Sequence, residues 1–231
     1  MYCCMNSEKE WKRLEGFQGY GNPRSELWFL GIEEKLPWGA DEKEELKARA
    51  TFKKVMDLHL AHMKLGRKVE TAKTPTWMWM SKFARALLNE ANDWRDRAKA
   101  RDYKNRCLGR KGGQTFLSEL FPFPARTSKD SPSPKRYGNR KVYEQAILPK
   151  RRKLLIHMLT KHKPRYVIAY GKKVHYRELF HECGVQVWKR IDGYTQCCRL
   201  GKTKIVLIPF FRRGFGHKAV SKAVKWFKDA S

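Results

Sequence analysis

The sequence predicts an α/β fold, a three-layer α/β/α sandwich with a mostly parallel central sheet. Two short, almost wholly apolar runs, 26–31 and 165–171, each end in glycine, as expected for strands buried on both faces of a sheet. Between and after these runs lie longer stretches whose apolar residues recur at helical spacing. Strands that alternate with helices are typical of a parallel sheet covered by helices on both faces.

The first half of the chain gives four expected elements. A strand at 26–31 follows a turn-like segment at 19–23 and is followed by one helix from about 41 to 63. A further helix begins near Thr74-Pro75-Thr76, which supplies capping and first-turn residues. The basic stretch 92–110 either extends that helix or forms an exposed excursion.

The second half begins with an expected strand at 115–120. It runs into Phe-Pro-Phe-Pro at 121–124, which must leave the sheet because proline lacks the N–H for a ladder bond. The Ser-, Pro- and Lys/Arg-containing segment 125–140 is predicted to be a mobile basic loop. The remaining expected elements are a helix at 149–162 with Pro149 in its first turn, a strand at 165–171, a helix to about 182, a strand at 185–188, a hairpin of 194–200 and 204–208 that turns at Gly201, and a helix at 217–228.

Length and composition predict a single domain over 1–231, with basic insertions near 92–112 and 125–140. The start is polar, so no secretory signal is expected, and no apolar run approaches the length of a membrane span. None of the six cysteines forms a C-x-x-C pair, which is poor spacing for zinc or an iron–sulfur cluster. We therefore expect a cytoplasmic protein with reduced thiols that needs no metal and no cofactor.

Charge gives the first indication of function. The chain has 51 Lys and Arg against 23 Asp and Glu, a formal net charge of +28. Nucleic acid is the usual partner of such a protein, because each neutralised phosphate releases condensed counterions. A membrane surface would require a basic helix with an exposed apolar face, and no segment predicts one. DNA or RNA is thus the expected partner of a protein that we expect to be a monomer.

Ligands of open α/β sheets bind beyond the carboxyl ends of the strands, so the loops after those ends hold the candidate site. Glu33 and Glu34 follow the first strand, and Glu119 ends the second. Two interpretations of the adjacent pair stay open. Either one carboxylate is held over a reaction centre, or it caps a following helix and satisfies backbone N–H groups.

Aromatic and basic residues complete the candidate set. Trp38, Phe121 and Phe123 would form a rigid wall for a flat ring, unless the two phenylalanines belong to the core. The candidates for DNA binding are basic residues of the predicted loop 125–140, of the loop after the last strand and of the start of the closing helix: Arg126, Lys135, Arg136, Arg212, Arg213 and His217, with Arg212 and Arg213 suited to phosphates. For the pair Arg212 and Arg213 the alternative is a solvated surface turn.

Four segments together resemble the uracil-DNA-glycosylase-like superfamily: ELWFLGIEE at 26–34, LFPFP at 120–124, KPRYVIAYG at 163–171 and IVLIPFFRR at 205–213. The resemblance spans about residues 19–227. It implies that Glu33, or else Glu34, guides the attacking water, and that Glu119 stands where the family has an asparagine that reads the base edge. Residues 210–213 replace the family's histidine motif, so the resemblance implies a modified base in place of uracil.

The resemblance implies a monofunctional DNA glycosylase that hydrolyses the N-glycosidic bond of a flipped-out base and leaves an abasic site. The superfamily includes phage-defence enzymes that remove glucosylated hydroxymethylcytosine. This chain is similar to them in its basic insertions and in lacking the residues by which the family recognises uracil. The alternatives are a uracil-DNA glycosylase of base-excision repair, a non-catalytic nucleic-acid-binding module of the same fold, and a nuclease whose carboxylates hold Mg²⁺.

Overall fold

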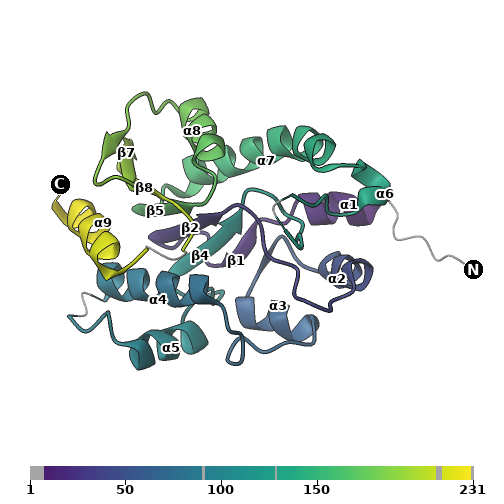
Figure 1. The fold of residues 1–231 in the computed structure, drawn as a ribbon, viewed down its shortest axis with the longest axis horizontal. Helices are drawn as coiled ribbons and strands as arrows, with labels where there is room; N and C mark the ends of the chain where they lie inside the picture. Colours follow the sequence, from purple (N-terminus) through teal and green to yellow (C-terminus); the bar gives the residue numbers. More distant parts are fainter. Residues whose placement is uncertain (1–7, 90–91, 128, 212–214, 230–231) are drawn as a thin grey trace, which may run out of the picture.

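An eight-stranded sheet lies between two layers of helices in the computed structural model, which describes residues 8–89, 92–127, 129–211 and 215–229 (Figure 1). This is the predicted three-layer α/β/α fold. The strands are β1 Gly19–Gly21, β2 Leu27–Gly31, β3 Val55–Met56, β4 Thr115–Glu119, β5 Tyr166–Tyr170, β6 Lys189–Arg190, β7 Gln196–Leu200 and β8 Thr203–Ile208. The helices are α1 Glu8–Glu15, α2 Glu42–Arg49, α3 Leu58–Lys64, α4 Pro75–Leu88, α5 Arg97–Arg106, α6 Pro134–Tyr137, α7 Arg140–His162, α8 Lys173–Glu182 and α9 His217–Asp229.

The strand order is β3-β1-β4-β2-β5-β8-β7-β6, and the four central strands β4, β2, β5 and β8 are mutually parallel. The strands outside these four add antiparallel pairs, β1 with β4, β7 with β8 and β6 with β7. The carboxyl ends of the central strands are nearly level, because Gly31 pairs with Glu119 and Tyr170 pairs with Ile208. The loops after these strands therefore begin at one edge of the sheet.

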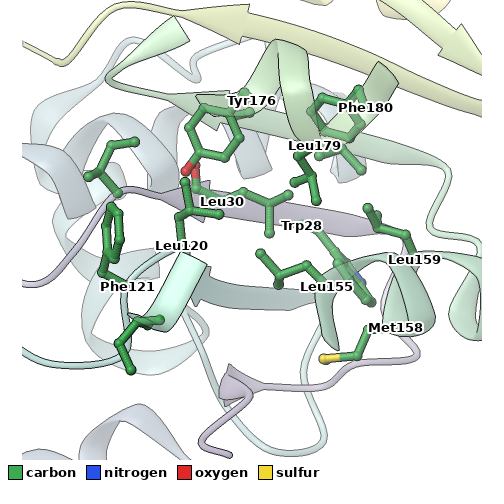
Figure 2. Packing of buried hydrophobic residues seen from close by; sticks show 14 of the residues in the cluster. Trp28, Leu30, Leu120, Phe121, Leu155, Met158, Leu159, Tyr176, Leu179 and Phe180 are labelled. Carbon is green, nitrogen blue, oxygen red and sulfur yellow. The ribbon is translucent and has the colours of Figure 1, made fainter. Parts of the chain in front are cut away.

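Both faces of the central strands are buried, which explains their nearly continuous apolar sequence. On one face α7 and α8 pack on the sheet through Leu155 and Leu179, with Trp28 of β2 between them (Figure 2). On the other face α4 and α9 pack through Phe83 and Phe227. Figure 1 shows these helices on opposite sides of the strands.

The single helix predicted over 41–63 is wrong. The chain forms α2, the short strand β3, and then α3. Asp57 starts α3, because its carboxylate accepts hydrogen bonds from the N–H groups of His59 and Leu60. Val55 and Met56 pair with β1, a strand in the segment that the sequence predicts to be a turn. Leu46 of α2 and Leu58 of α3 are buried, whereas Leu60 and Met63 of α3 are exposed.

Helix α7 begins at Arg140 rather than near Pro149, which lies inside the helix. Asn139 is its N-cap and accepts a hydrogen bond from the Val142 N–H. The predicted strand at 185–188 is also wrong, because the short strand in this region is β6. The predicted loop at 125–140 contains α6, and Tyr137 of that helix is buried against Trp11.

The other predicted elements are confirmed within a few residues, including the hairpin of β7 and β8 around Gly201. The stretch 92–110 holds a separate helix, α5, which packs on α4. Cys107, Cys183, Cys197 and Cys198 are free thiols, while Cys3 and Cys4 lie outside the described residues. Among the described helices, none combines the length and the apolar character that crossing a membrane requires.

Candidate active site

The chain changes direction across the sheet at β2. From β2 it passes to β4 on one side and later to β5 on the other, so β2 lies between two strands whose following loops diverge. A crevice at such a switch point is where open α/β sheets bind ligands. The residues at this point are Gly31, which ends β2, Glu119, which ends β4, and Tyr170, which ends β5.

Glu119 is the most unusual residue of the three. Its Oε1 accepts a hydrogen bond of 3.2 Å from the Tyr170 hydroxyl, whereas its buried Oε2 has no partner among the described residues. Burial raises the pKa of Glu119 well above its ordinary value, and the nearby carboxylate of Glu34 raises it further. Both effects favour the protonated form of the Glu119 carboxyl, which can donate a hydrogen bond as well as accept one.

The carboxyl group of Glu119 fits only because residue 31 is glycine. A Cβ on residue 31 would lie 2.0 Å from the Glu119 Oε2 and 2.3 Å from the Tyr170 hydroxyl. The Tyr176 hydroxyl in turn holds the main chain at the end of β2. It donates to the carbonyls of Gly31 and Leu30, and the Leu30 carbonyl oxygen is 2.8 Å away. Figure 2 shows Tyr176 next to Leu30. The Tyr176 hydroxyl of α8 thus holds one side of the end of β2. The Glu119 carboxyl and the Tyr170 hydroxyl lie against its other side.

Glu34 is an ionised carboxylate in a network of charged groups. Its Oε2 lies 2.5 Å from Nη2 of Arg49, whose Nη1 donates to the Tyr20 hydroxyl at 3.1 Å and whose Nε donates to Glu45 at 2.9 Å. Burial raises the pKa of Glu34, but the charge and hydrogen bonds of Arg49 outweigh it, so the pKa lies below its ordinary value. The pKa values of Glu34 and Glu119 are therefore shifted in opposite directions, which is a common way to assign base and acid roles to two carboxyl groups.

Glu33 points to the α7 side of the sheet. Its Oε2 lies 2.6 Å from Nη1 of Arg140, whose Nε binds Glu144 at 2.7 Å, and Glu144 also contacts Lys172. Burial raises the pKa of Glu33, although Arg140 acts in the opposite direction. The Arg140 guanidinium also lies over the Phe121 ring, 4.7 Å from its centroid. The Glu33 side chain thus joins the loop after β2 to the start of α7.

Arg151 of α7 anchors the β4 end from behind. Its guanidinium donates to the carbonyls of Glu119, Phe17 and Gln18 and to the Ser118 hydroxyl, with 2.8 Å to Glu119 and 3.1 Å to Ser118. Arg151 is 2% exposed, and this burial lowers its pKa to about 10, so it remains charged at neutral pH. One side chain therefore holds the segment before β1 and the end of β4 together.

A small cavity separates the two acidic groups of interest. Glu34 and Glu119 line it together with Tyr20 and Arg151, and its room for water centres is about 10 Å³, on the order of one water molecule. Glu33 is not part of its lining. The structure thus brings together Glu34 and Glu119 from the predicted set and places Glu33 in a different group of charges.

The predicted aromatic residues lie apart from this cavity. Phe121 and Phe123 have no exposed surface and pack on Tyr143, with ring centroids 5.5 and 5.7 Å from it. A base can therefore reach neither ring in this conformation, and both phenylalanines belong to the core. Trp38 is the opposite case, since its side chain is 99% exposed on the loop before α2.

The basic candidates are scattered. Arg126 donates to the Ala40 carbonyl at 3.0 Å, and Lys135 is exposed on α6. Arg136 lies over the Trp11 ring at 4.7 Å and pairs with Glu8. His217 starts α9 and lies between the rings of Trp79 and Trp94. Arg212 and Arg213 lie outside the described residues.

The sequence analysis missed the partners of the acidic residues, which are Arg49, Arg140, Arg151, Tyr20 and Tyr170. Two of them had a detectable signal. Tyr170 directly precedes the glycine that ends a predicted strand, which places it at the same sheet edge as Glu119. Arg151 interrupts an apolar helical face, since it lies four positions before Leu155. No comparable pattern marks Arg49 or Arg140.

Within the described residues, no three or more His, Cys, Asp or Glu side chains are grouped so that they could hold a metal ion. Comparison with known proteins found no family model that matches the chain and no match among curated proteins.

Proposed function

We propose that the protein is a DNA glycosylase that hydrolyses the N-glycosidic bond of a modified base and leaves an abasic site. The observation that carries this proposal is that Glu34, whose pKa is lowered, and Glu119, whose pKa is raised, line one cavity of about one water molecule at the carboxyl edge of the sheet. The net charge of +28 supports DNA as the substrate.

Hydrolysis of an N-glycosidic bond develops positive charge on the sugar and negative charge on the leaving base. In this proposal the Glu34 carboxylate stabilises the sugar cation and takes a proton from the water whose oxygen bonds to C1′. The C1′–N bond breaks, its electron pair leaves with the base, and the neutral carboxyl of Glu119 donates a hydrogen bond to the base. Glu33 positions the loop through Arg140.

A base is larger than the present cavity, so the proposal requires the loops after β2 and β4 to separate when DNA binds. Those loops are joined by hydrogen bonds between the backbone of Leu36 and Ala125 and between Ala125 and Glu34. A modified cytosine, such as the glucosylated hydroxymethyl form, is proposed over uracil, because residues 210–213 replace the histidine motif of the superfamily that the sequence resembles.

The test is a panel of DNAs that contain no modification, uracil, hydroxymethylcytosine or glucosylated hydroxymethylcytosine. Each is incubated with the protein in EDTA, and abasic sites are measured as strand breaks after hot alkali. The variant with Glu33→Gln and Glu34→Gln is compared with one that carries Glu178→Gln and Glu182→Gln, which removes the same charge from half-exposed ion pairs of α8. Breaks on one modified DNA that only the first variant loses would support the proposal, and no breaks on any DNA would overturn it.

A second candidate, a non-catalytic nucleic-acid-binding module, is favoured by a different observation. Glu33 and Glu34 both form ion pairs, and the rings of Phe121 and Phe123 are buried. In this case the carboxylates only stabilise the loop after β2. The same panel separates the two, because a binding module would retain salt-dependent affinity for DNA and release no base from any of the substrates.

A further inference from the structure

A basic groove lies away from the candidate active site, between α4, α5 and the segment that leads into α4. Its lining contains five cationic side chains and one carboxylate, that of Glu70. The cationic residues are Lys73, Lys82, Arg97, Arg101 and Lys104. Pro75, Met78 and Trp79 form the apolar part of the lining. The groove therefore offers an elongated anion both positive charge and apolar surface.

Helical spacing accounts for the cations from α5. Arg97, Arg101 and Lys104 stand at positions i, i+4 and i+7, so they form one stripe along the helix. Like charges four residues apart destabilise a helix by about 0.2–0.5 kcal/mol per pair, and the first turn of α5 contains no acidic residue. Folding alone gives no reason to place these charges together on the face that lines the groove.

The charges in the groove are short of counterions. Burial lowers the pKa of Lys82, and Arg97 lowers it further; burial likewise lowers the pKa of Lys104, and Arg101 adds to the effect. Glu70, the carboxylate of the lining, is shared with His59 at 3.2 Å. A bound polyanion would relieve this repulsion between the cations.

The start of α4 adds a further positive end to the groove. Its N-cap, Thr74, makes no side-chain capping hydrogen bond, and the first turn has no acidic residue. Thr74 and Pro75 both line the groove. The positive end of the dipole of this 14-residue helix thus faces the same space as the cations.

The depth of the groove distinguishes between kinds of nucleic acid. Lys104 is only 3% exposed, and its Nζ donates to the carbonyls of Glu70 and Ala72 at 3.2 and 3.3 Å. An ammonium group has three N–H donors, so one is left for a ligand that enters the groove. A flexible single strand can follow a basic groove with apolar and aromatic side chains, so that its phosphates meet both the recessed Lys104 and the exposed Arg97 and Arg101.

We propose that the groove between α4 and α5 binds a segment of single-stranded nucleic acid through its phosphates, with the sugars or bases against Met78 and Trp79. The groove is distinct from the cavity of Glu34 and Glu119, and the inference does not depend on cleavage of a glycosidic bond. It assigns a role in binding to the basic stretch 92–110.

The test compares two variants of the full chain with the same loss of charge. One carries Arg97→Gln and Arg101→Gln in the groove, and the control carries Lys153→Gln and Lys161→Gln, both exposed on α7. Binding of a fluorescent unmodified oligodeoxynucleotide, single-stranded or duplex, is measured by anisotropy over a range of NaCl concentrations. Circular dichroism confirms that each variant is folded.

The groove variant is expected to bind the single strand more weakly than the control does. The slope of log K against log salt is expected to fall by about 0.7 for each lost phosphate contact. Equal affinity and slope for the two variants would overturn the proposal, and so would a loss confined to the duplex. Because the assay uses unmodified DNA and measures binding alone, its result is independent of any glycosylase activity.

Discussion

Oε2 of Glu119 occupies the space that a side chain at residue 31 would need. A Cβ there would come within 2.0 Å of this oxygen, at the point where β2 and β4 end in register. The glycine at the end of β2 is therefore required by the acidic group of the neighbouring strand. Four predictions follow from this site.

Replacing Gly31 with alanine should destabilise the protein. The added methyl group must displace the buried Oε2 of Glu119 or the hydroxyl of the buried Tyr170, and overpacking of this kind costs about 1–3 kcal/mol. The free energy of unfolding, measured with urea, is the readout. Gly193→Ala is the control, because a Cβ at residue 193 has no atom within 4 Å. Equal stability of the two variants would show that the ends of β2 and β4 can accommodate a side chain at residue 31.

The stability of the wild type relative to a Glu119→Gln variant should fall as pH rises. Unfolded Glu119 has a pKa of about 4.3, and burial raises the folded pKa well above it. The folded state thus holds the proton more tightly, and the resulting stability is present below about pH 4.3 and lost as pH rises through the folded pKa. Urea unfolding of both proteins at mildly acidic and mildly alkaline pH measures this difference.

A Glu144→Gln variant provides a control of opposite sign for that experiment. Burial raises the pKa of Glu144, but Arg140 and Lys172 lower it by more, so the pKa lies below its ordinary value. This carboxylate therefore contributes stability above its unfolded pKa, which is lost as pH falls through the folded pKa. As pH rises, the wild type should gain on Glu144→Gln below about pH 4.3, where the lowered pKa of Glu144 acts, and should lose to Glu119→Gln above about pH 4.3. A common direction for both variants would contradict the assignment of a neutral Glu119.

Glu34→Gln should reduce base release more than Glu33→Gln does. If Glu34 is the ionised group next to the reacting sugar, its loss should slow abasic-site formation by about 100-fold or more. Glu33 is proposed to act through Arg140 and α7, so its loss should cost about tenfold at most. Single-turnover rates on the preferred DNA, with binding measured in parallel, separate chemistry from affinity. A larger loss for Glu33→Gln would reverse the two roles.

Arg151→Met should destabilise the protein by about 3 kcal/mol or more, because the carbonyls of Phe17 and Glu119 would be left buried without donors. Arg152→Met is the matched control on the same helix. Arg152 pairs with the half-exposed Glu178 and Glu182, and pairs of that kind contribute about 1 kcal/mol or less. Thermal or urea unfolding of both variants measures the difference. Similar losses would mean that solvent satisfies the carbonyls.

The strands of the central sheet were predictable because burial on both faces requires a short run of apolar residues, which is visible in the local sequence. β2 and β5 are short apolar runs that end in glycine, and their predicted and observed bounds agree within a residue or two. β1 was missed, because the strand Gly19–Gly21 has two glycines in three residues and is specified by its neighbours β3 and β4. The 41–63 helix was wrong for a similar reason: β3 pairs with β1, a long-range interaction that no local pattern reveals.

The acidic residues of the candidate site were predictable from their positions after strand ends, but their protonation was not. That property depends on which cation each carboxyl meets. Arg49 reaches Glu34, while the guanidinium of Arg151 is used on main-chain carbonyls, including that of Glu119. The sequence could equally have paired Arg151 with a carboxylate. Burial of Phe121 and Phe123 was foreseen only as one of two alternatives.

The bonds from α7 also determine when this site can form. Arg140 reaches Glu33 across 107 positions of the chain, and Arg151 reaches Phe17 across 134. Contacts so distant in sequence require large loops to close, and they form slowly compared with local ones. During synthesis, the ends of β2 and β4 emerge before the helix that fixes them. The acidic cavity is therefore completed only after residue 151 has been made, and a shorter nascent chain would contain Glu34 and Arg49 without Arg151.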